Sequence, residues 1–182
     1  MVKMIEYKIF ENILPKAAFQ EIKILLTAQN FPYFYAASTD GMDGVPMFCH
    51  ILVQNNEVNS ESFGEAHRIL QPLFKVVKDE TGFNTIVRIK INMYMNHGEQ
   101  KEMGIHTDFP NSQLDYYTGV FNLTECNGYT GLIVGDKEVK VPSKENQFIL
   151  FHGDTPHYGV TPSDKQNRLI INFDFIKTEE EE

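Results

Sequence analysis

The first third of the chain combines two helical stretches with short extended ones. Apolar side chains recur every three to four positions in residues 15–28 and 62–80, which is the pattern of amphipathic helices. Pro72 falls inside the second stretch, so we expect a kink there or a break into two shorter helices. Residues 31–35 and 47–53 have the aromatic or apolar composition of extended segments.

From residue 84 onward the pattern becomes one of short strands. Residues 85–95 alternate: Ile86, Arg88, Lys90, Asn92 and Tyr94 share one parity, and the residues between them are apolar. Further strands are predicted at residues 116–123, 129–134, 138–141, 147–151, 158–160 and 168–176, with turn residues between them. Strands at this spacing without intervening helices predict a mainly β fold with flanking helices, an antiparallel sandwich or jelly roll. The two helices would pack on the outside of one sheet.

The change of pattern near residue 82 is interpreted as a change of layer, because neither part has an obvious independent core. The length of 182 residues fits one domain. We therefore expect a single domain over residues 1–178, with an α/β support in 1–82 and a jelly-roll core in 83–176. Residues 179–182 are four glutamates, which we expect to form a solvated acidic tail.

Composition and charge exclude several classes of protein. Apolar residues make up 42% and charged residues 23%, which excludes disordered and collagen-like chains. No apolar run is long enough to span a membrane, and the N-terminus lacks the pattern of a signal peptide. The net charge of −9, with only three arginines, disfavours a general nucleic-acid binder. Two cysteines form neither a disulfide framework nor a metal motif, so we expect a cytoplasmic location. The oligomeric state has no signal in the sequence.

Candidate metal ligands begin with His106-Thr107-Asp108 in the β-rich region. On a strand, positions i and i+2 point to the same face, so both side chains can reach one ion. Taken alone, this triplet is weak evidence for a metal site, because a surface histidine beside a turn aspartate gives the same pattern. His157, at the mouth of a late predicted strand, offers a third ligand. Two histidines and one carboxylate leave three positions open on an octahedral metal, which is the facial triad of non-haem Fe(II) oxygenases.

Arg168 stands eleven residues after His157, at the head of an otherwise apolar strand. A guanidinium cannot lose its charge on burial, so it needs an anionic partner there. Two kinds of partner remain open. One is a dicarboxylate co-substrate, because a carboxylate matches the planar fork of arginine. The other is a structural partner such as Asp174 or a nearby glutamate.

The set His106-x-Asp108, His157 and Arg168 resembles the Fe(II)/2-oxoglutarate-dependent dioxygenase superfamily. More narrowly, four segments resemble small prolyl-4-hydroxylase-like oxygenases of phages and marine microbes: Phe31-Pro32-Tyr33-Phe34-Tyr35, Arg88-Ile89-Lys90, Asn127-Gly128-Tyr129-Thr130 and Arg168-Leu169-Ile170-Ile171-Asn172-Phe173. The resemblance covers nearly the whole chain and is strongest over residues 84–176. It implies a double-stranded β-helix, the cupin-like form of the jelly roll.

The resemblance also implies cofactors and residue roles. His106, Asp108 and His157 would bind Fe(II) as the catalytic metal, and Arg168 would bind the distal carboxylate of 2-oxoglutarate. O2 is the second co-substrate, and ascorbate is an optional accessory reductant. Residues whose position or parity directs them into the barrel are further candidates for contact with 2-oxoglutarate: Asn92, Tyr94, Thr118 and Asn122. Core packing is the alternative interpretation for these four. Asn122 departs from the family, because a second tyrosine for 2-oxoglutarate would align there.

The expected reaction is hydroxylation of a substrate with release of succinate and CO2. A peptidyl prolyl side chain is the first substrate class. A nucleic-acid base is the second and is weakened by the net negative charge, and a free amino acid or small metabolite stays open. The alternative function is a cupin-type metal-binding module or isomerase without 2-oxoglutarate chemistry. Such a protein has no need of an arginine eleven residues past the last metal ligand.

Overall fold

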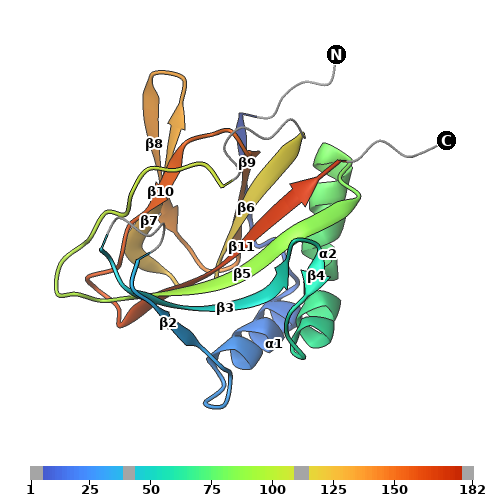
Figure 1. Cartoon of the computed structure of the whole chain (residues 1–182), viewed down its shortest axis with the longest axis horizontal. Coiled ribbons are helices and arrows are strands. Elements are labelled where there is room, and N and C mark those ends of the chain that lie inside the picture. The colour runs from blue at the N-terminus through green and yellow to red at the C-terminus, as the bar shows by residue number, and fades with distance from the viewer. Residues whose placement is uncertain (1–5, 39–43, 109–114, 178–182) are drawn as a thin grey trace.

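The computed structural model describes residues 6–38, 44–108 and 115–177 (Figure 1). Within these ranges the chain forms, in order, β1 (Tyr7–Glu11), α1 (Lys16–Thr27), β2 (Phe34–Ala36), β3 (Met47–Gln54), β4 (Glu57–Val58), α2 (Phe63–Thr81), β5 (Thr85–Met95), β6 (Tyr116–Asn122), β7 (Cys126–Val134), β8 (Lys137–Ser143), β9 (Gln147–His152), β10 (His157–Gly159) and β11 (Asn167–Ile176). The predicted acidic tail lies outside the described residues.

The strands form two facing antiparallel sheets. The main sheet has the order β1-β9-β6-β11-β5-β3-β2, with β4 paired to β3, and the minor sheet has the order β10-β7-β8. Two bridges, Glu102 to Val160 and His106 to His157, attach the segment 102–106 beside β10 and so extend the minor sheet. Facing antiparallel sheets with crossovers between non-neighbouring strands make a jelly roll. The predicted mainly β fold is confirmed.

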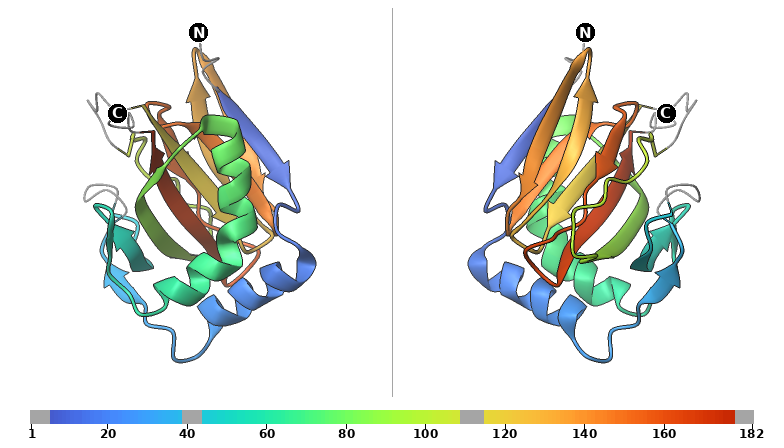
Figure 2. Two further views of the ribbon diagram at one scale, coloured as in Figure 1. Left: turned by 90° about the vertical axis from the view of Figure 1, so that its right-hand side faces the viewer. Right: turned by 90° about the vertical axis from the view of Figure 1, so that its left-hand side faces the viewer.

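Both helices pack on one face of the main sheet, which we call the outer face (Figure 2). The apolar stripe of α1 buries Phe19, Ile22 and Leu26, and the longer stripe of α2 includes Leu73. These side chains share one core with alternate residues of the central strands, such as Ile91 of β5. The helical periodicity seen in the sequence is therefore the face by which each helix attaches to the sheet.

α2 runs through Pro72 as one helix. The expected break into two shorter helices is wrong, and Figure 2 shows that the helix bends along its length instead. Proline removes one backbone hydrogen bond and clashes with the carbonyl four residues earlier, which kinks a helix. Leu70 and Leu73, on either side of Pro72, are both fully buried against the sheet. This packing holds the two halves of the helix together despite the proline.

The segment before residue 82 contributes strands as well as helices. β1 pairs with β9 at one edge of the main sheet, and β2 and β3 lie at the other edge. The sequence pattern does not predict β1, because its five residues are all exposed or half-buried and do not alternate. Residues on both sides of position 82 thus share one sheet, and the single-domain organisation stays a prediction.

β5 follows the alternation that the sequence predicts, with one exception. Ile89 and Ile91 belong to the outer-face core, whereas Tyr94 belongs to the core between the two sheets. Ile86 has the parity of Tyr94 but packs on the outer-face core. The reason is a bulge, because the pairing of β5 with β11 skips one residue between Ile86 and Arg88.

The register of β5 against β11 places polar residues in pairs on the inner face of the main sheet, the face that meets the minor sheet. Four successive inner-face pairs follow from it: Tyr94–Arg168, Asn92–Ile170, Lys90–Asn172 and Arg88–Asp174. β6 extends three of these rows: Asn122 lies beside Ile170, Val120 beside Asn172 and Thr118 beside Asp174. A polar strip therefore runs along the inner face between apolar neighbours.

Gly119 and Gly64 give a matched test of the outer-face packing. A Cβ added at Gly119, in β6, would lie 2.4 Å from the Phe148 ring and 3.4 Å from Phe175. Gly119→Ala should therefore lower the free energy of unfolding by about 1–3 kcal/mol, the usual cost of overpacking a core. Gly64, in the first turn of α2, has no atom within 4 Å of an added Cβ. Gly64→Ala should be neutral or raise the free energy of unfolding by up to about 1 kcal/mol.

Urea unfolding of the wild type and the two variants measures this difference. Equal unfolding midpoints for the two variants would contradict the close packing of β6 on β9.

Candidate metal centre

His106, Asp108 and His157 converge at one point between the two sheets. Each offers a ligand atom, and these atoms all lie within 4.8 Å of one another. The backbones of His106 and His157 bond to each other in both directions, each N–H donating to the other carbonyl at 2.9 Å. This bridge sets the two imidazole rings side by side, with their centroids 4.6 Å apart. The structure thus brings together the three residues that the sequence nominated as metal ligands.

Both histidines are oriented by a backbone carbonyl two residues earlier. Nδ1 of His106 lies 2.9 Å from the Gly104 carbonyl oxygen, and Nδ1 of His157 lies 3.0 Å from that of Thr155. Because a carbonyl oxygen only accepts, Nδ1 must be the donor in each ring. Nε2 of each ring is then the atom that can bind a metal, which is the usual arrangement of histidine ligands with a second hydrogen-bond partner.

Arg88 fixes the orientation of the Asp108 carboxylate. Its Nη2 forms an ion pair with Oδ1 of Asp108, while Oδ2 lies 3.5 Å from Nε2 of His157. One oxygen is therefore held by the protein and the other points to the histidines. Burial alone raises the pKa of Asp108, but the interaction with His157 and the charge of Arg88 outweigh it and lower that pKa well below its usual range. The carboxylate is ready to bind a cation through Oδ2.

Arg88 also holds a second carboxylate, that of Asp174. Its Nε lies 2.5 Å from Oδ2 of Asp174, whose side chain is fully buried. Burial, followed by the neighbouring charge of Asp108, raises the pKa of Asp174 to about 7 against the opposing effect of Arg88. The Thr118 hydroxyl lies 3.3 Å from Asp108 Oδ2 and 3.2 Å from Asp174 Oδ1, and its one hydrogen can serve only one of them at a time. Thr118 therefore lies beside the Asp108 carboxylate.

Arg168 is fully buried on β11 and has no carboxylate partner among the described residues. Nη1 donates to the Tyr129 carbonyl oxygen at 2.6 Å, and Nη2 donates to Thr130 Oγ1 at 2.8 Å and to Asn122 Oδ1 at 3.2 Å. Nε is buried without an acceptor. Burial lowers the pKa of the guanidinium, but arginine keeps its charge in proteins. Asp174, the structural partner considered from the sequence, is bound by Arg88 instead.

A small cavity of about 30 Å³ joins the two histidines to Arg168. Its lining consists of Tyr94, His106, Val120, Thr130, His157, Tyr158, Gly159, Arg168, Ile170 and Asn172. This lining includes the two histidines that could bind a metal and the buried guanidinium of Arg168. The cavity thus connects the Arg168 guanidinium with the position at which the histidines could bind a metal.

The remaining residues expected to contact a co-substrate fall into two groups. Tyr94 lines the cavity, with the Arg168 guanidinium carbon 6.0 Å from its ring centroid. Asn92 lies behind it and donates from Nδ2 to the Tyr94 hydroxyl at 3.1 Å. Asn122 is fully buried behind Arg168 and donates from Nδ2 to Gln147 Oε1 at 3.1 Å. Asn92, Thr118 and Asn122 therefore contact lining residues or the candidate ligand Asp108 and do not line the cavity themselves.

Sequence reasoning assigned no role at this site to Arg88 or Asn172, and considered Asp174 only as a partner for Arg168. All three carry the parity of the inner face on β5 and β11. That parity is the signal that could have found them, because a charged residue on the polar side of a half-buried strand points at whatever the barrel encloses. The pairing of Arg88 with Asp108 crosses from β5 to a loop, and no periodicity predicts it.

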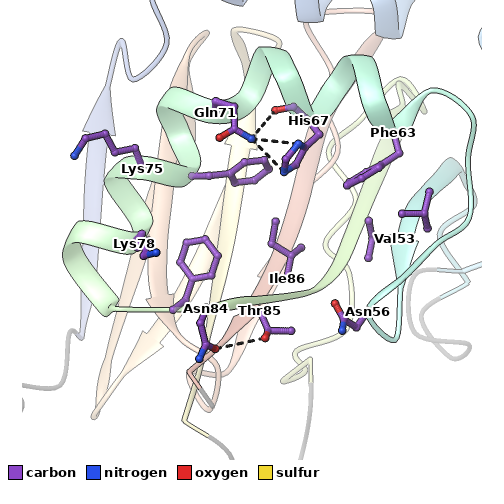
Figure 3. A pocket seen from close by; sticks show the side chains of 13 residues that line it. Val53, Asn56, Phe63, His67, Gln71, Lys75, Lys78, Asn84, Thr85 and Ile86 are labelled. Carbon is purple, nitrogen blue, oxygen red and sulfur yellow. Dashed lines mark hydrogen bonds between the residues drawn. The ribbon is translucent and has the colours of Figure 1, made fainter. Parts of the chain in front are cut away.

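A second, larger hollow lies on the outer face beneath α2 (Figure 3). Phe63, His67 and Phe74 of α2 and Ile86 of β5 line it, and Gln71 bonds to His67. Because Phe74 and Ile86 belong to the outer-face core, the main sheet separates this hollow from the histidine pair. Among the described residues, it contains no cluster of metal-ligating side chains.

No protein-family model and no curated protein matches this sequence. Solved structures do match. An oxidoreductase of the 2OG-Fe(II) oxygenase family from Burkholderia pseudomallei superposes with a TM-score of 0.79 at 13% identity, over 96% of this chain and 86% of that chain. A prolyl hydroxylase from Trichoplax adhaerens, solved with a peptide fragment of hypoxia-inducible factor, gives 0.70 at 18% identity, over 94% and 84%.

A third solved structure was determined with ligands bound. The epimerase SnoN of nogalamycin biosynthesis, in complex with Fe3+, α-ketoglutarate and nogalamycin RO, gives a TM-score of 0.66 at 14% identity, over 94% of this chain and 79% of that chain. The chain therefore has the fold of the 2-oxoglutarate/Fe(II) oxygenases. The narrower phage and marine-microbial branch stays a prediction.

Asp108→Ala tests the candidate metal centre. The variant should keep its fold, because Arg88 retains Asp174 as a partner. Its affinity for Co(II) should fall by at least about a hundredfold, since loss of even an outer partner of a ligand costs roughly 10–100-fold. Asp136→Ala, in the exposed turn between β7 and β8, is the matched control and should bind Co(II) as the wild type does. Absorption titration measures the affinity, and circular dichroism measures the fold.

Unchanged Co(II) affinity in folded Asp108→Ala would remove Asp108 from the ligand set. Loss of folding would make Asp108 a structural residue.

Proposed function

We propose that this chain is an Fe(II)- and 2-oxoglutarate-dependent dioxygenase that hydroxylates an organic substrate. The observation that carries the proposal is Arg168, a fully buried cation without a carboxylate partner in the described part of the chain, which shares a cavity with His106 and His157. A buried charge of this kind is costly unless a ligand compensates it. A dicarboxylate that also binds the metal supplies the compensation.

The donor set suits Fe(II). Two neutral imidazole Nε2 atoms and one carboxylate oxygen bind one side of an octahedral ion and leave three positions open. His106, His157 and Asp108 would hold the metal, with Arg88 keeping Asp108 Oδ1 occupied and Oδ2 directed inward. When bound, iron and 2-oxoglutarate supply the oxidative chemistry, in which O2 converts 2-oxoglutarate to succinate and CO2 and hydroxylates the substrate.

Arg168 and Tyr94 would hold the distal carboxylate of 2-oxoglutarate. The Arg168 Nε–H has no acceptor among the described residues and is the donor that such a carboxylate would satisfy. The carbonyl of Tyr129 and the hydroxyl of Thr130 fix the plane of the guanidinium before any ligand arrives. A fork held in place loses less entropy when it binds a carboxylate. Ascorbate as an accessory reductant stays an expectation.

The alternative, a cupin-type metal protein without 2-oxoglutarate, gives Arg168 no partner.

The first substrate class remains a peptidyl prolyl side chain. The likeness of fold to a prolyl hydroxylase solved with a peptide supports that choice. A nucleic-acid base remains disfavoured by the net charge of −9. In the described ranges, no helix is long and apolar enough to span a bilayer, and a cytoplasmic location stays a prediction.

Arg168 variants test the proposal through binding. Arg168→Lys keeps the charge but loses the planar fork, so Zn(II)-loaded protein should bind 2-oxoglutarate more weakly than wild type. Arg168→Ala should bind it weakest, with a loss on the order of 2–5 kcal/mol, because one partner of a buried charge pair is removed. Arg68→Lys, on the exposed side of α2, is the control and should bind normally. Calorimetric titration gives the affinities.

The lysine variant is needed because Arg168→Ala also removes the donor to buried Thr130 Oγ1 and one of the two donors to Asn122 Oδ1, the other being Ser143. If both variants fold, hold the metal and bind 2-oxoglutarate as tightly as the wild type, Arg168 does not hold the co-substrate and the proposal fails. Release of succinate by wild-type protein supplied with Fe(II), O2 and 2-oxoglutarate is the accompanying activity test.

A further inference from the structure

Lys90 is a cation on the inner face that the proposed iron and 2-oxoglutarate sites do not use. It belongs to the pair Lys90–Asn172, which directly precedes the Arg88–Asp174 pair beside the metal carboxylate. Its side chain is half-buried, and it makes no hydrogen bond or ion pair within the described part of the chain. Its Nζ is not among the buried unpaired atoms of the described residues, so the ammonium can be reached from outside and has three donors to offer a ligand.

The neighbours of Lys90 do not neutralise it. Burial is the largest influence and lowers the pKa of the ammonium, Arg88 acts in the same direction, and Cys49 and Asp108 act in the opposite one. Asp108 is the carboxylate among these, and its Oδ1 is bound by Arg88 while its Oδ2 faces His157 and Thr118. Neither oxygen forms a hydrogen bond or ion pair with Lys90 in the described part of the chain.

The side chains beside Lys90 are also incompletely paired. Two amide oxygens near Lys90 are buried without a donor. They are Oδ1 of Asn172, the residue that pairs with Lys90, and Oδ1 of Asn92, two residues further along β5. A carbonyl oxygen only accepts, so these two atoms call for a donor, and it is Nδ2 of Asn172 that could donate to a carboxylate. Of these residues, Asn172 lines the cavity beside the histidines, whereas Lys90 and Asn92 stand next to it along the inner face of β5.

The charges of the site leave room for one more anion. Arg88, Lys90 and Arg168 are three cations, and Asp108 and Asp174 are two carboxylates, which gives 3 − 2 = +1. Fe(II) adds two positive charges and a 2-oxoglutarate dianion removes them, so the excess of +1 remains. Protonation of Asp174 would make the excess larger. The proposed cofactor and co-substrate therefore do not neutralise Lys90.

We propose that Lys90, with Asn172 beside it, binds a carboxylate carried by the substrate. This inference rests on the proposed function and narrows its substrate to an acid whose carboxylate lies close to the hydroxylated carbon. A free amino acid, the C-terminal residue of a peptide and an acidic side chain all fit this description. The carboxylate of 2-oxoglutarate that lies next to the metal could bind Lys90 in the same way. The experiment therefore distinguishes a carboxylate of the substrate from that of 2-oxoglutarate.

The first arm compares probes that differ only in charge. A pool of N-acetyl-L-amino acids and the matched pool of N-acetyl-L-amino acid amides are offered to protein loaded with Zn(II) and 2-oxoglutarate, and binding is followed by ligand-observed NMR. The tightest acid and its amide are then compared by calorimetry. The acid should bind at least about tenfold more tightly than the amide, as expected for a hydrogen bond to a charged group.

Variants assign the preference to Lys90. Lys90→Met keeps the length of the side chain without its charge and should abolish the difference between acid and amide. Lys90→Arg should retain most of it. Lys75→Met, which removes an exposed charge on α2, is the control and should bind like the wild type. Equal binding of acid and amide by the wild type, a preference that persists in Lys90→Met, or no binding of either pool would overturn the inference.

The second arm titrates 2-oxoglutarate into Zn(II)-loaded wild type and Lys90→Met without a probe. Similar affinities support a substrate carboxylate, whereas a loss of tenfold or more in Lys90→Met would assign Lys90 to the co-substrate and overturn the inference. If the wild type itself does not bind 2-oxoglutarate, the proposed function fails. If it binds 2-oxoglutarate but does not distinguish acid from amide, only the inference about Lys90 fails.

Discussion

The register between β5 and β11 decides which side chains face the metal centre. Along both strands, apolar residues such as Ile91 and Ile171 lie in the outer-face core under the helices, which leaves the alternate residues on the inner face. A shift of the strand register by one residue would exchange the two faces. Arginine and aspartate would then lie under the helices, and isoleucine would lie on the inner face. The hydrophobic packing of α1 and α2 therefore fixes the position of Arg88, Lys90 and Arg168.

The inner-face charges serve positioning more than stability. Burying an ion pair costs desolvation energy that often equals the Coulombic gain, so the ion pairs of Arg88 with Asp108 and Asp174 add little net stability. What they provide is a single orientation of Asp108, with one oxygen held and one directed to the histidines. Arg168 differs, because carbonyl and amide oxygens orient it without neutralising it. The protein thus balances the charge at the metal end and leaves positive charge where a ligand would bind.

Much of the fold, and the convergence of the three candidate ligands, could be predicted from the sequence. β5 alternates clearly, the later strands are short β-rich runs separated by turn residues, and the spacing of His106, Asp108 and His157 matches a facial triad. β1 could not be predicted, because an edge strand with exposed residues has no alternation, and intact α2 depends on tertiary packing across Pro72. The pairing of Arg88 with Asp108 and the placement of Asn122 behind Arg168 depend on loop geometry and three-dimensional neighbours, which no local pattern contains.

One spectrum tests the central claim most directly, namely that one cavity holds iron and 2-oxoglutarate together. Wild-type protein is mixed anaerobically with Fe(II) and then with 2-oxoglutarate while the visible absorption is recorded. A charge-transfer band that appears only when both are present, saturates with 2-oxoglutarate and is absent with Zn(II) is the result we expect. Saturating Fe(II) and 2-oxoglutarate without any such band would contradict the account.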